Sequence, residues 1–258
     1  MSKRILLLLC VALAVIMLQG CAGKKPAHSP APDATAAASG TAATDETAED
    51  YGDNGNGEPY PDAIEGFNRG VFTFNDGFIT YVFSPFDTVY TGFFPQDVRN
   101  GFGNFYRNLG YPVRLINALL QFKFDKIGKE TASFALNTVF GVGGLFNVTR
   151  NMPALQSSPE DFSQTLAFYG LGEGTYVVVP FLGPSTVRDV VGTVADSFLH
   201  PLSLVTPDSA RYALVGHDKV NAASAALPTY KEIKKESFDH YTSMKDVFFQ
   251  YRRGLEQE

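Results

Sequence analysis

The sequence predicts an all-α protein: a single helical domain that follows a secretion signal and a low-complexity segment. Three observations predict this class. From residue 62 onward, apolar residues recur at the spacing of a helix face. Prolines stand where one such pattern ends and the next begins. Strand-like composition is confined to a single short stretch, residues 176–182, which is rich in β-branched residues.

The first expected helix begins with a capping-box pattern. Asp62 is the expected N-cap, and Glu65 stands three residues later, where its carboxylate can reach back to the backbone N–H of the cap. The apolar residues that follow at helical spacing are Phe67, Val71, Phe74 and Phe78. Pro85 is expected to end this helix, because proline lacks the backbone N–H that a helix interior requires.

Three further helices are expected before residue 141. Pro95 and Pro112 each open one, since proline is favoured in the first turn of a helix. Their apolar faces are Val98, Phe102, Phe105 and Leu109, and then Val113, Ile116 and Leu120. A fourth helix is expected over residues 125–140, and it ends at Gly141.

The helical pattern is weaker after Gly141. Residues 176–182 are compatible with a strand and equally with a buried helical or extended segment. A helix then begins at Pro184 or Ser185. It has Arg188 and Asp189 off an apolar face made of Val187, Val190, Val191 and Val194. The last helix is expected over residues 228–253, with the apolar stripe Tyr230, Ile233, Tyr241, Met244, Phe248 and Tyr251.

Residues 1–20 have the order of a lipoprotein signal peptide. Two basic residues precede an apolar run over residues 5–18, which is short for a membrane span and typical of a secretion signal. Leu18-Gln19-Gly20-Cys21 then has the form of a lipobox, in which a small residue precedes the cysteine that receives the lipid. Cys21 is therefore the predicted lipid-attachment site. The alternative is an ordinary signal peptide that is cut elsewhere.

Residues 21–61 are predicted to be the lipidated cysteine and a disordered tether, and residues 62–258 the helical domain. The tether contains no Val, Ile, Leu, Met or Phe, so it cannot bury enough apolar surface to offset the entropy of ordering. Ala22, rather than an aspartate, follows the cysteine and favours transfer to the outer membrane. Cleavage removes Cys10, and acylation of the remaining cysteine excludes an intramolecular disulfide.

No constellation of residues indicates catalysis, a metal or a nucleotide. The glycine-rich residues 141–144 lack the Lys-Ser/Thr of a phosphate loop, and the four histidines have no metal-ligand spacing. Gly183-Pro184-Ser185-Thr186 is not a nucleophile elbow, and Glu160-Asp161 is more typical of a helix N-terminus than of an acid/base pair. No basic stretch indicates nucleic acid. We therefore expect a protein that is not an enzyme and binds no cofactor, metal or nucleic acid.

Aromatic residues are abundant in the helical domain. All 22 phenylalanines of the chain lie within residues 62–258. Several helices also carry an aromatic residue off the apolar stripe, namely Phe72, Tyr106 and Phe249. A helix that is apolar on more than one face lies in a thick core or contacts lipid, and the sequence leaves both interpretations open.

Several motifs occur in the same order as in a known family of lipoproteins. They are Ile64-Glu65-Gly66-Phe67-Asn68-Arg69, Asn108-Leu109-Gly110-Tyr111-Pro112, Asp161-Phe162-Ser163-Gln164-Thr165-Leu166, Pro180-Phe181-Leu182-Gly183-Pro184 and Tyr251-Arg252-Arg253. With them, residues 62–253 resemble the MlaA or VacJ-like phospholipid-transport lipoproteins. Thr175 stands where the family usually has proline, and Lys245 where arginine is common. Neither departure removes a motif.

The resemblance implies a ring-like, membrane-embedded helical domain with an amphipathic channel, lying in the inner leaflet of an outer membrane. It implies a lipid-anchored protein on the periplasmic side that removes mislocalised phospholipid from the outer leaflet. The implied partners are a trimeric porin and a periplasmic lipid-carrier protein. A structural porin-associated lipoprotein without transport activity is the alternative, and a lipid-acting hydrolase is disfavoured because no nucleophile is assembled.

Two sets of residues are candidates for roles in the lipid path. The candidate channel-lining residues are Asn68, Asn75, Asn137 and Asp161, with Asn104 and Asn117 as further polar positions in apolar helices. The alternative for each asparagine is a helix-to-helix hydrogen bond or a cap. The candidate gate or hinge is Gly141, Gly143, Gly144, Leu145 and Phe146, since glycine tolerates large backbone changes. The alternative is that these glycines let two helices pack closely.

Overall fold

The computed structural model describes Tyr60 and residues 62–257, which lie in one compact unit, Asp50–Glu258. The predicted signal peptide, Cys21 and all of the predicted tether but Tyr60 lie outside the described residues. The all-α class is confirmed, because helices dominate the described residues and their one sheet has two strands. The α-helices are α2 (Glu65–Phe78), α3 (Ser84–Phe93), α4 (Gln96–Leu109), α5 (Tyr111–Leu120), α6 (Phe124–Val139), α7 (Phe162–Phe168), α8 (Val187–Leu199), α9 (Asp208–Glu236) and α10 (His240–Glu256).

The start of the first helix differs from the predicted capping box. Helix α2 begins at Glu65 with Ile64 as its N-cap, and no side chain caps it. The carboxylate of Asp62 accepts a 3.3 Å hydrogen bond from the Ile64 backbone N–H, a 2.7 Å hydrogen bond from the Asn68 amide and another from the Tyr241 hydroxyl. The capping box is therefore wrong, because two partners far from the cap position hold the carboxylate.

The prediction that Pro85 ends the first helix is also wrong. Helix α2 continues through a π-helical turn, η1 (Ile79–Phe83), directly into α3. A π turn holds one residue more than an α turn, and such turns relieve the clash between a proline ring and the preceding turn. Pro85 is the second residue of α3, directly after the π-helical turn.

Helices α4, α5 and α6 agree with their predicted positions. Helix α4 begins directly after Pro95, and α5 carries Pro112 in its first turn. Helix α6 ends at Val139, just before the glycine-rich residues. The aromatic rings of Tyr111 and Phe134 stack at 4.2 Å and join α5 to α6.

Within residues 176–182, residues 176–179 form a strand and residues 180–182 form a turn, so the strand alternative holds for the first part of this stretch. Strand β1 (Tyr176–Val179) pairs antiparallel with β2 (Gly183–Thr186), with Tyr176 opposite Thr186. The turn between them uses Phe181 at φ 64° and Gly183 at φ 88°. Thr186 then caps α8 by accepting a hydrogen bond from the Asp189 backbone N–H.

The predicted last helix is two helices. Helix α9 contains Pro228 in its interior, and α10 begins at His240. Asp239 separates them: its carboxylate accepts hydrogen bonds from the backbone N–H groups of Tyr241 and Thr242 and so caps α10. The predicted start at residue 228 was wrong because Pro228 lies inside α9, which begins at Asp208. The break before α10 was missed because the apolar stripe continues across this cap, whereas the helical backbone does not.

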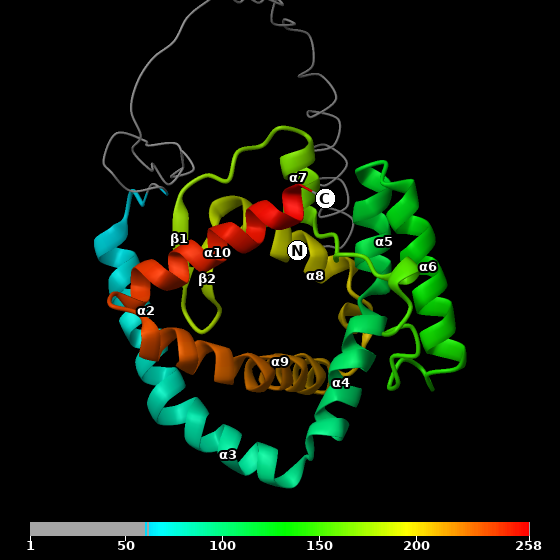
Figure 1. Ribbon diagram of the computed structural model, residues 1–258, viewed down its shortest axis with the longest axis horizontal. Coiled ribbons are helices and arrows are strands. Elements are labelled where there is room, and N and C mark those ends of the chain that lie inside the picture. Colours follow the sequence, from blue (N-terminus) through cyan, green and yellow to red (C-terminus); the bar gives the residue numbers. More distant parts are fainter. Residues whose placement is uncertain (1–59, 61, 258) are drawn as a thin grey trace, which may run out of the picture. The chain divides into compact units, whose positions relative to one another are not determined.

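Within this unit the helices follow a ring-like path (Figure 1). Helices α2, η1 and α3 lead along one side to α4, and α9 runs back toward α2. Lys234 on α9 pairs with Asp76 on α2 at 2.6 Å, and Asp239 before α10 pairs with Arg69 on α2 at 2.8 Å. These contacts tie the last helices to the first one.

The aromatic core is small and lies between α2, β1 and α10. Its buried members are Tyr60, Phe72, Tyr176, Val178, Tyr241 and Phe249. Tyr60 stacks on Phe249 with ring centroids 4.3 Å apart. Tyr60 lies just before the predicted start of the domain, so any shortened chain should keep it. Phe72, Tyr106 and Phe249, the aromatic residues off the apolar stripes, are all buried.

Candidate lipid-contact surface and polar interior

Helix α2 has polar side chains on its buried side and aromatic ones on its exposed side. Asn68 is 0% exposed and Asn75 is also buried, whereas Phe67 is 60% exposed and Phe74 is 51% exposed. Phe67 and Phe74 of the predicted apolar stripe are thus on the outside, whereas Val71 is half-buried and packs against the aromatic core that contains Phe72. The two asparagines are buried on the inner side of the helix. A soluble helix has the opposite arrangement, in which the apolar stripe faces the core.

Asn68 and Asn75 complete the hydrogen bonding of β1 and the turn after it. The Asn68 amide donates to the Tyr176 carbonyl at 3.0 Å and accepts from the Val178 N–H at 2.9 Å. Asn75 donates to the Val179 carbonyl at 3.0 Å and accepts from the Phe181 N–H at 2.8 Å. The two amides therefore occupy the edge of β1 that β2 leaves open. Their role in lining a channel stays a prediction.

Helix α8 shows the same inversion. Val187, Val191, Val194 and Phe198 are exposed, whereas Arg188 and Asp189 are buried. The sequence placed these two charged residues off the valine face, and that geometry is observed. The structure adds that the charged face is the inner one.

A charged cluster joins α7, α8 and α10 in this interior. The Arg252 guanidinium lies 2.6 Å from the Asp161 carboxylate and 2.7 Å from that of Asp189. Asp189 also accepts a hydrogen bond from the Ser163 hydroxyl, and Arg188 pairs with Glu256. Burial opposes the ionisation of Asp161, but the hydrogen bond and positive charge of Arg252 outweigh it and hold the pKa of Asp161 below its usual value.

Asp161 is also the N-cap of α7. Its carboxylate accepts a 2.8 Å hydrogen bond from the Gln164 backbone N–H. The interpretation of Glu160-Asp161 as a helix N-terminus is therefore confirmed. Both this cap and the Arg252 pair hold the carboxylate, and its predicted role in lining a channel stays a prediction.

Buried neutral polar groups extend the interior toward α5. Asn117 is 0% exposed; its amide nitrogen donates to Asp196 at 2.9 Å, and its carbonyl oxygen accepts from the Thr165 hydroxyl at 2.8 Å. Burial raises the pKa of Asp196 above its usual value. The buried residues Arg188, Asp189 and Arg252 were not assigned a role by the sequence. Their signals in the sequence were the position of Arg188 and Asp189 beside an apolar helix face and the place of Arg252 in a family motif.

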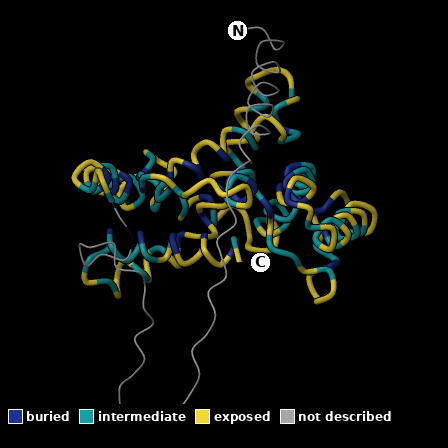
Figure 2. Tube along the Cα trace, turned by 90° about the horizontal axis from the view of Figure 1, so that it is seen from above, coloured by how far each residue is buried: buried dark blue, intermediate teal, exposed yellow. Residues whose placement is uncertain are grey.

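Large apolar side chains are exposed along most helices, and exposed residues are spread over the whole unit (Figure 2). Along the continuous path of α2, η1 and α3, the most exposed are Phe67, Tyr81, Val82, Val89 and Phe93. Tyr81 is 80% exposed and Phe93 is 77% exposed. Contiguous exposed apolar surface of this kind marks an interaction site with protein or membrane.

The glycines of the candidate gate occupy different environments. A Cβ at Gly141 would lie 2.1 Å from the Phe146 carbonyl oxygen, and one at Gly144 would lie 2.4 Å from Cβ of Asn108. Gly143 has φ 70° and open space around it. Two of the three positions therefore permit close packing, which is the alternative to a hinge. Phe146 is 65% exposed, and the proposed gate stays a prediction.

The remaining predicted polar residues lie beside this loop. Asn137 on α6 donates to the Thr149 hydroxyl at 3.2 Å, and Asn104 on α4 donates to the Leu145 carbonyl at 3.3 Å. Both amides thus tie residues 141–159 to neighbouring helices.

None of the described helices has both the length and the hydropathy that a helix needs to cross a membrane. Within the same part of the chain, no group of three or more His, Cys, Asp or Glu side chains is arranged to hold a metal ion.

The fold and the distribution of side chains define a class: an all-α, ring-like protein with a polar interior and an apolar exterior. Residues 60–255 match the MlaA lipoprotein family, and the chain belongs to this family. The resemblance inferred from the motifs is therefore confirmed.

Three similar proteins illustrate the family. The intermembrane phospholipid transport system lipoprotein MlaA of Escherichia coli (strain K12) is 34% identical over 194 residues, which cover 73% of this chain and 76% of that protein. An uncharacterized protein of Rickettsia conorii is 32% identical, covering 80% of this chain and 82% of its own. A solved structure, reported under "Structural basis for maintenance of bacterial outer membrane lipid asymmetry", aligns with a TM-score of 0.65 at 29% identity. The alignment covers 76% of this chain and 99% of that one.

Proposed function

We propose that this chain is an outer-membrane lipoprotein that removes mislocalised phospholipid from the outer leaflet and passes it to a periplasmic carrier, thereby maintaining lipid asymmetry. The observation that carries the proposal is the inversion of α2 and α8, whose apolar faces are exposed while Asn68 and Arg188 are buried. An apolar exterior suits contact with acyl chains, which need no hydrogen bonds. The family relationship supports phospholipid and the outer membrane as the setting.

The proposed mechanism requires no bond change in the lipid. The helical body lies in the inner leaflet, and the apolar residues of α2, α3 and α8 face the acyl chains. The transfer of a charged lipid headgroup from water into the hydrocarbon core has a large unfavourable free energy, so a path through the protein has to offer polar groups. We propose that a trimeric porin holds the body in place and that a periplasmic lipid-carrier protein receives the lipid.

Deletion of the gene tests this function. We expect phospholipid in the outer leaflet to rise in the deletion strain, as measured by chemical labelling or lipase digestion at the cell surface. The full chain supplied in trans should restore the normal level. The second candidate, a structural porin-associated lipoprotein, predicts an unchanged outer leaflet after deletion together with altered porin assembly.

The lipid anchor gives a separate prediction. We expect radiolabelled palmitate to enter the full chain and Cys21→Ala to abolish the label, because the thiol of Cys21 is the acceptor of the lipid. Cys10→Ala is the matched control: it removes the other cysteine, which lies in the signal peptide, and should leave the label unchanged. Labelling of the Cys21→Ala variant, or fractionation of the wild type with the inner membrane, would contradict the prediction.

The gate gives a third prediction. A Cβ at Gly101 on α4 would lie 3.5 Å from the Leu145 carbonyl oxygen, so α4 and the loop are in close backbone contact here, and Gly101→Cys with Leu145→Cys is the cysteine pair chosen to join them. If residues 141–159 must move, oxidation should stop phospholipid removal, and reduction should restore it, with protein level and porin association unchanged. The Gly101→Cys single variant is the control. Normal transport with the disulfide verified would refute the gate, and loss of folding would favour the packing role of these glycines.

A further inference from the structure

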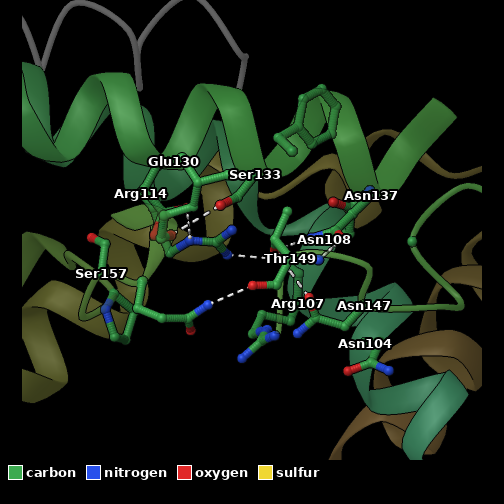
Figure 3. A pocket seen from close by; sticks show the side chains of 15 residues that line it. Asn104, Arg107, Asn108, Arg114, Glu130, Ser133, Asn137, Asn147, Thr149 and Ser157 are labelled. Atoms are coloured by element: carbon green, nitrogen blue, oxygen red, sulfur yellow. Dashed lines mark hydrogen bonds and ion pairs between the residues drawn. The ribbon is translucent and has the colours of Figure 1, made fainter. Parts of the chain in front are cut away.

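A polar cavity of about 170 Å³ lies between α4, α5, α6 and residues 144–159 (Figure 3). Most of the residues that line it are polar, so the cavity suits a small polar group. The lining residues are Asn104, Arg107, Asn108, Arg114, Glu130, Ser133, Phe134, Asn137, Gly144, Asn147, Thr149, Leu155, Gln156, Ser157 and Pro159.

The walls of this cavity are held in place by hydrogen bonds. The Asn108 amide, which is buried, donates to the Thr138 hydroxyl at 3.0 Å and to the Gly143 carbonyl at 3.3 Å. Thr149 is buried, and its carbonyl accepts a 2.7 Å hydrogen bond from Gln156. A site with fixed walls loses little conformational entropy when a ligand binds.

One positive charge in the cavity has no counter-charge. Arg114 pairs with Glu130 at 2.9 Å, and these two charges cancel. Within the part of the chain that the structure describes, no group pairs with the Arg107 guanidinium, which lies away from the Arg114–Glu130 pair in Figure 3. Desolvation by the surrounding protein lowers the pKa of Arg107, although the residue is still partly in contact with solvent, and the positive charge of Arg114 adds to this effect while the Glu130 carboxylate opposes it. A bound anion would offset the unfavourable contributions.

Asn147 offers further donors on the same side. Its side-chain oxygen accepts a 3.1 Å hydrogen bond from the Thr149 hydroxyl, which fixes the amide. Its amide nitrogen has no partner among the described residues, and Asn147 lines the same cavity as Arg107 (Figure 3). A guanidinium and an amide together present several N–H groups to one anion, and the guanidinium fork matches phosphate oxygens in a bidentate manner.

From these contacts we propose that this cavity binds the phosphate group of a phospholipid, with Arg107 and Asn147 as its donors. One uncompensated guanidinium matches the single negative charge of a phosphodiester. The loop that supplies Gly144 and Asn147 also exposes two apolar side chains, Val142 and Phe146, at 64% and 65%. A polar cavity beside apolar side chains suits a headgroup with attached acyl chains better than free phosphate. This inference rests on the proposed function and names the place where the headgroup is held.

The test measures binding of dihexanoyl phosphatidylglycerol, a soluble short-chain lipid, to the purified full chain by calorimetry. We expect Arg107→Met and Asn147→Asp each to weaken binding at least tenfold, since one charge-assisted hydrogen bond contributes about 1.5–3 kcal/mol. Asn147→Asp keeps the acceptor for Thr149 and replaces the donor with a negative charge. Arg211→Met is the matched control, because Arg211 lies on α9 outside the cavity and pairs with Asp208.

Two further ligands identify the source of the phosphate. Dihexanoylglycerol, which lacks phosphate, should not bind at this site, and inorganic phosphate should bind at least tenfold more weakly than the lipid. If inorganic phosphate binds as tightly and both variants weaken it, the site takes free phosphate and the lipid assignment is wrong. If the wild type does not bind the lipid, or if both variants bind it like the wild type, the site is refuted.

The failure of this site and the failure of the proposed function are distinguishable. An unchanged outer leaflet in the deletion strain would refute the function and leave phosphate binding by the purified chain intact. Unchanged binding by Arg107→Met would refute the site and leave the deletion result intact. Circular dichroism of each variant confirms that its helices are formed, and Arg107→Met removes no hydrogen bond or ion pair of the guanidinium within the described residues.

Discussion

Arg252→Met should destabilise the helical body by about 3–5 kcal/mol, because it leaves the buried Asp189 carboxylate and the partly exposed Asp161 carboxylate without their cation. Arg252 is buried and bridges Asp161 on one side and Asp189 on the other, at 2.6 and 2.7 Å. Methionine retains much of the volume of the side chain but none of its charge. We expect the midpoint of thermal unfolding in detergent to fall by on the order of 10 °C.

The neighbouring residue provides a matched control for this variant. Arg253 is exposed, and its guanidinium lies 4.6 Å from the centre of the Tyr60 ring. Arg253→Met removes the same charge from the same helix and should cost about 0.5–1 kcal/mol, the magnitude of an exposed cation–π contact. Equal effects of the two substitutions would contradict the assignment of Arg252 as the centre of a buried charged cluster.

The pH dependence of the Arg252→Met effect has a defined sign. The folded-state pKa of Asp161 is lowered, so the stabilisation by its ionised form is present above the unfolded pKa, about 3.9, and is lost as the pH falls. The difference in stability between the wild type and Arg252→Met should therefore shrink below about pH 4. A difference that is constant between pH 7 and pH 3 would exclude this electrostatic cause.

The second large effect concerns the exposed aromatic side chains of α2, η1 and α3. A chain starting at Tyr60, without the lipid anchor, should still need detergent and should float with liposomes. Phe67→Gln, Tyr81→Gln and Phe93→Gln together should reduce the liposome-bound fraction at least a hundredfold. Each large apolar side chain removed from lipid contact forfeits about 1.5–3 kcal/mol.

Stability separates this membrane effect from unfolding. The three side chains are 60%, 80% and 77% exposed, so their replacement should change the free energy of unfolding by no more than about 0.5 kcal/mol each. Thr73→Gln with Thr88→Gln is the control, since both threonines are exposed on the same helical path. Flotation of the triple variant at the wild-type level, or a shortened chain that is monomeric and soluble without detergent, would contradict lipid contact by this surface.

Local sequence patterns determined most of the helices. Prolines and apolar spacing placed α4, α5 and α6, because helix starts depend on nearby residues such as Pro95 and Pro112. These patterns predicted helix boundaries wrongly where hydrogen bonds, which the spacing of apolar residues does not show, determine the boundary. Asp62 bonds to Asn68 and Tyr241 instead of capping α2, and Asp239 interrupts an apolar stripe that continues from α9 to α10.

The candidate site was only partly accessible from the sequence. The motifs around Phe67 and Asp161 were sufficient to identify the family, and the absence of a nucleophile argued against a hydrolase. The cavity around Arg107 was not predictable, because its walls come from three helices and a loop that meet only in the folded chain. No local pattern distinguishes Arg107, which lacks a partner, from Arg114, which has one.

By itself, the sequence determined that the chain is helical and where its amphipathic faces lie. It did not determine which face points inward. Helical spacing defines an apolar stripe, as for Phe67 and Phe74 on α2 or Val187 and Val194 on α8. The spacing does not show whether the stripe faces the core, water or lipid. Only the tertiary structure decided that Asn68, Arg188 and Arg252 are buried while the aromatic and valine stripes are exposed. The physical reason is that buried polar groups are stable only when distant segments supply their partners, as the β1 backbone does for Asn68 and Asp161 does for Arg252.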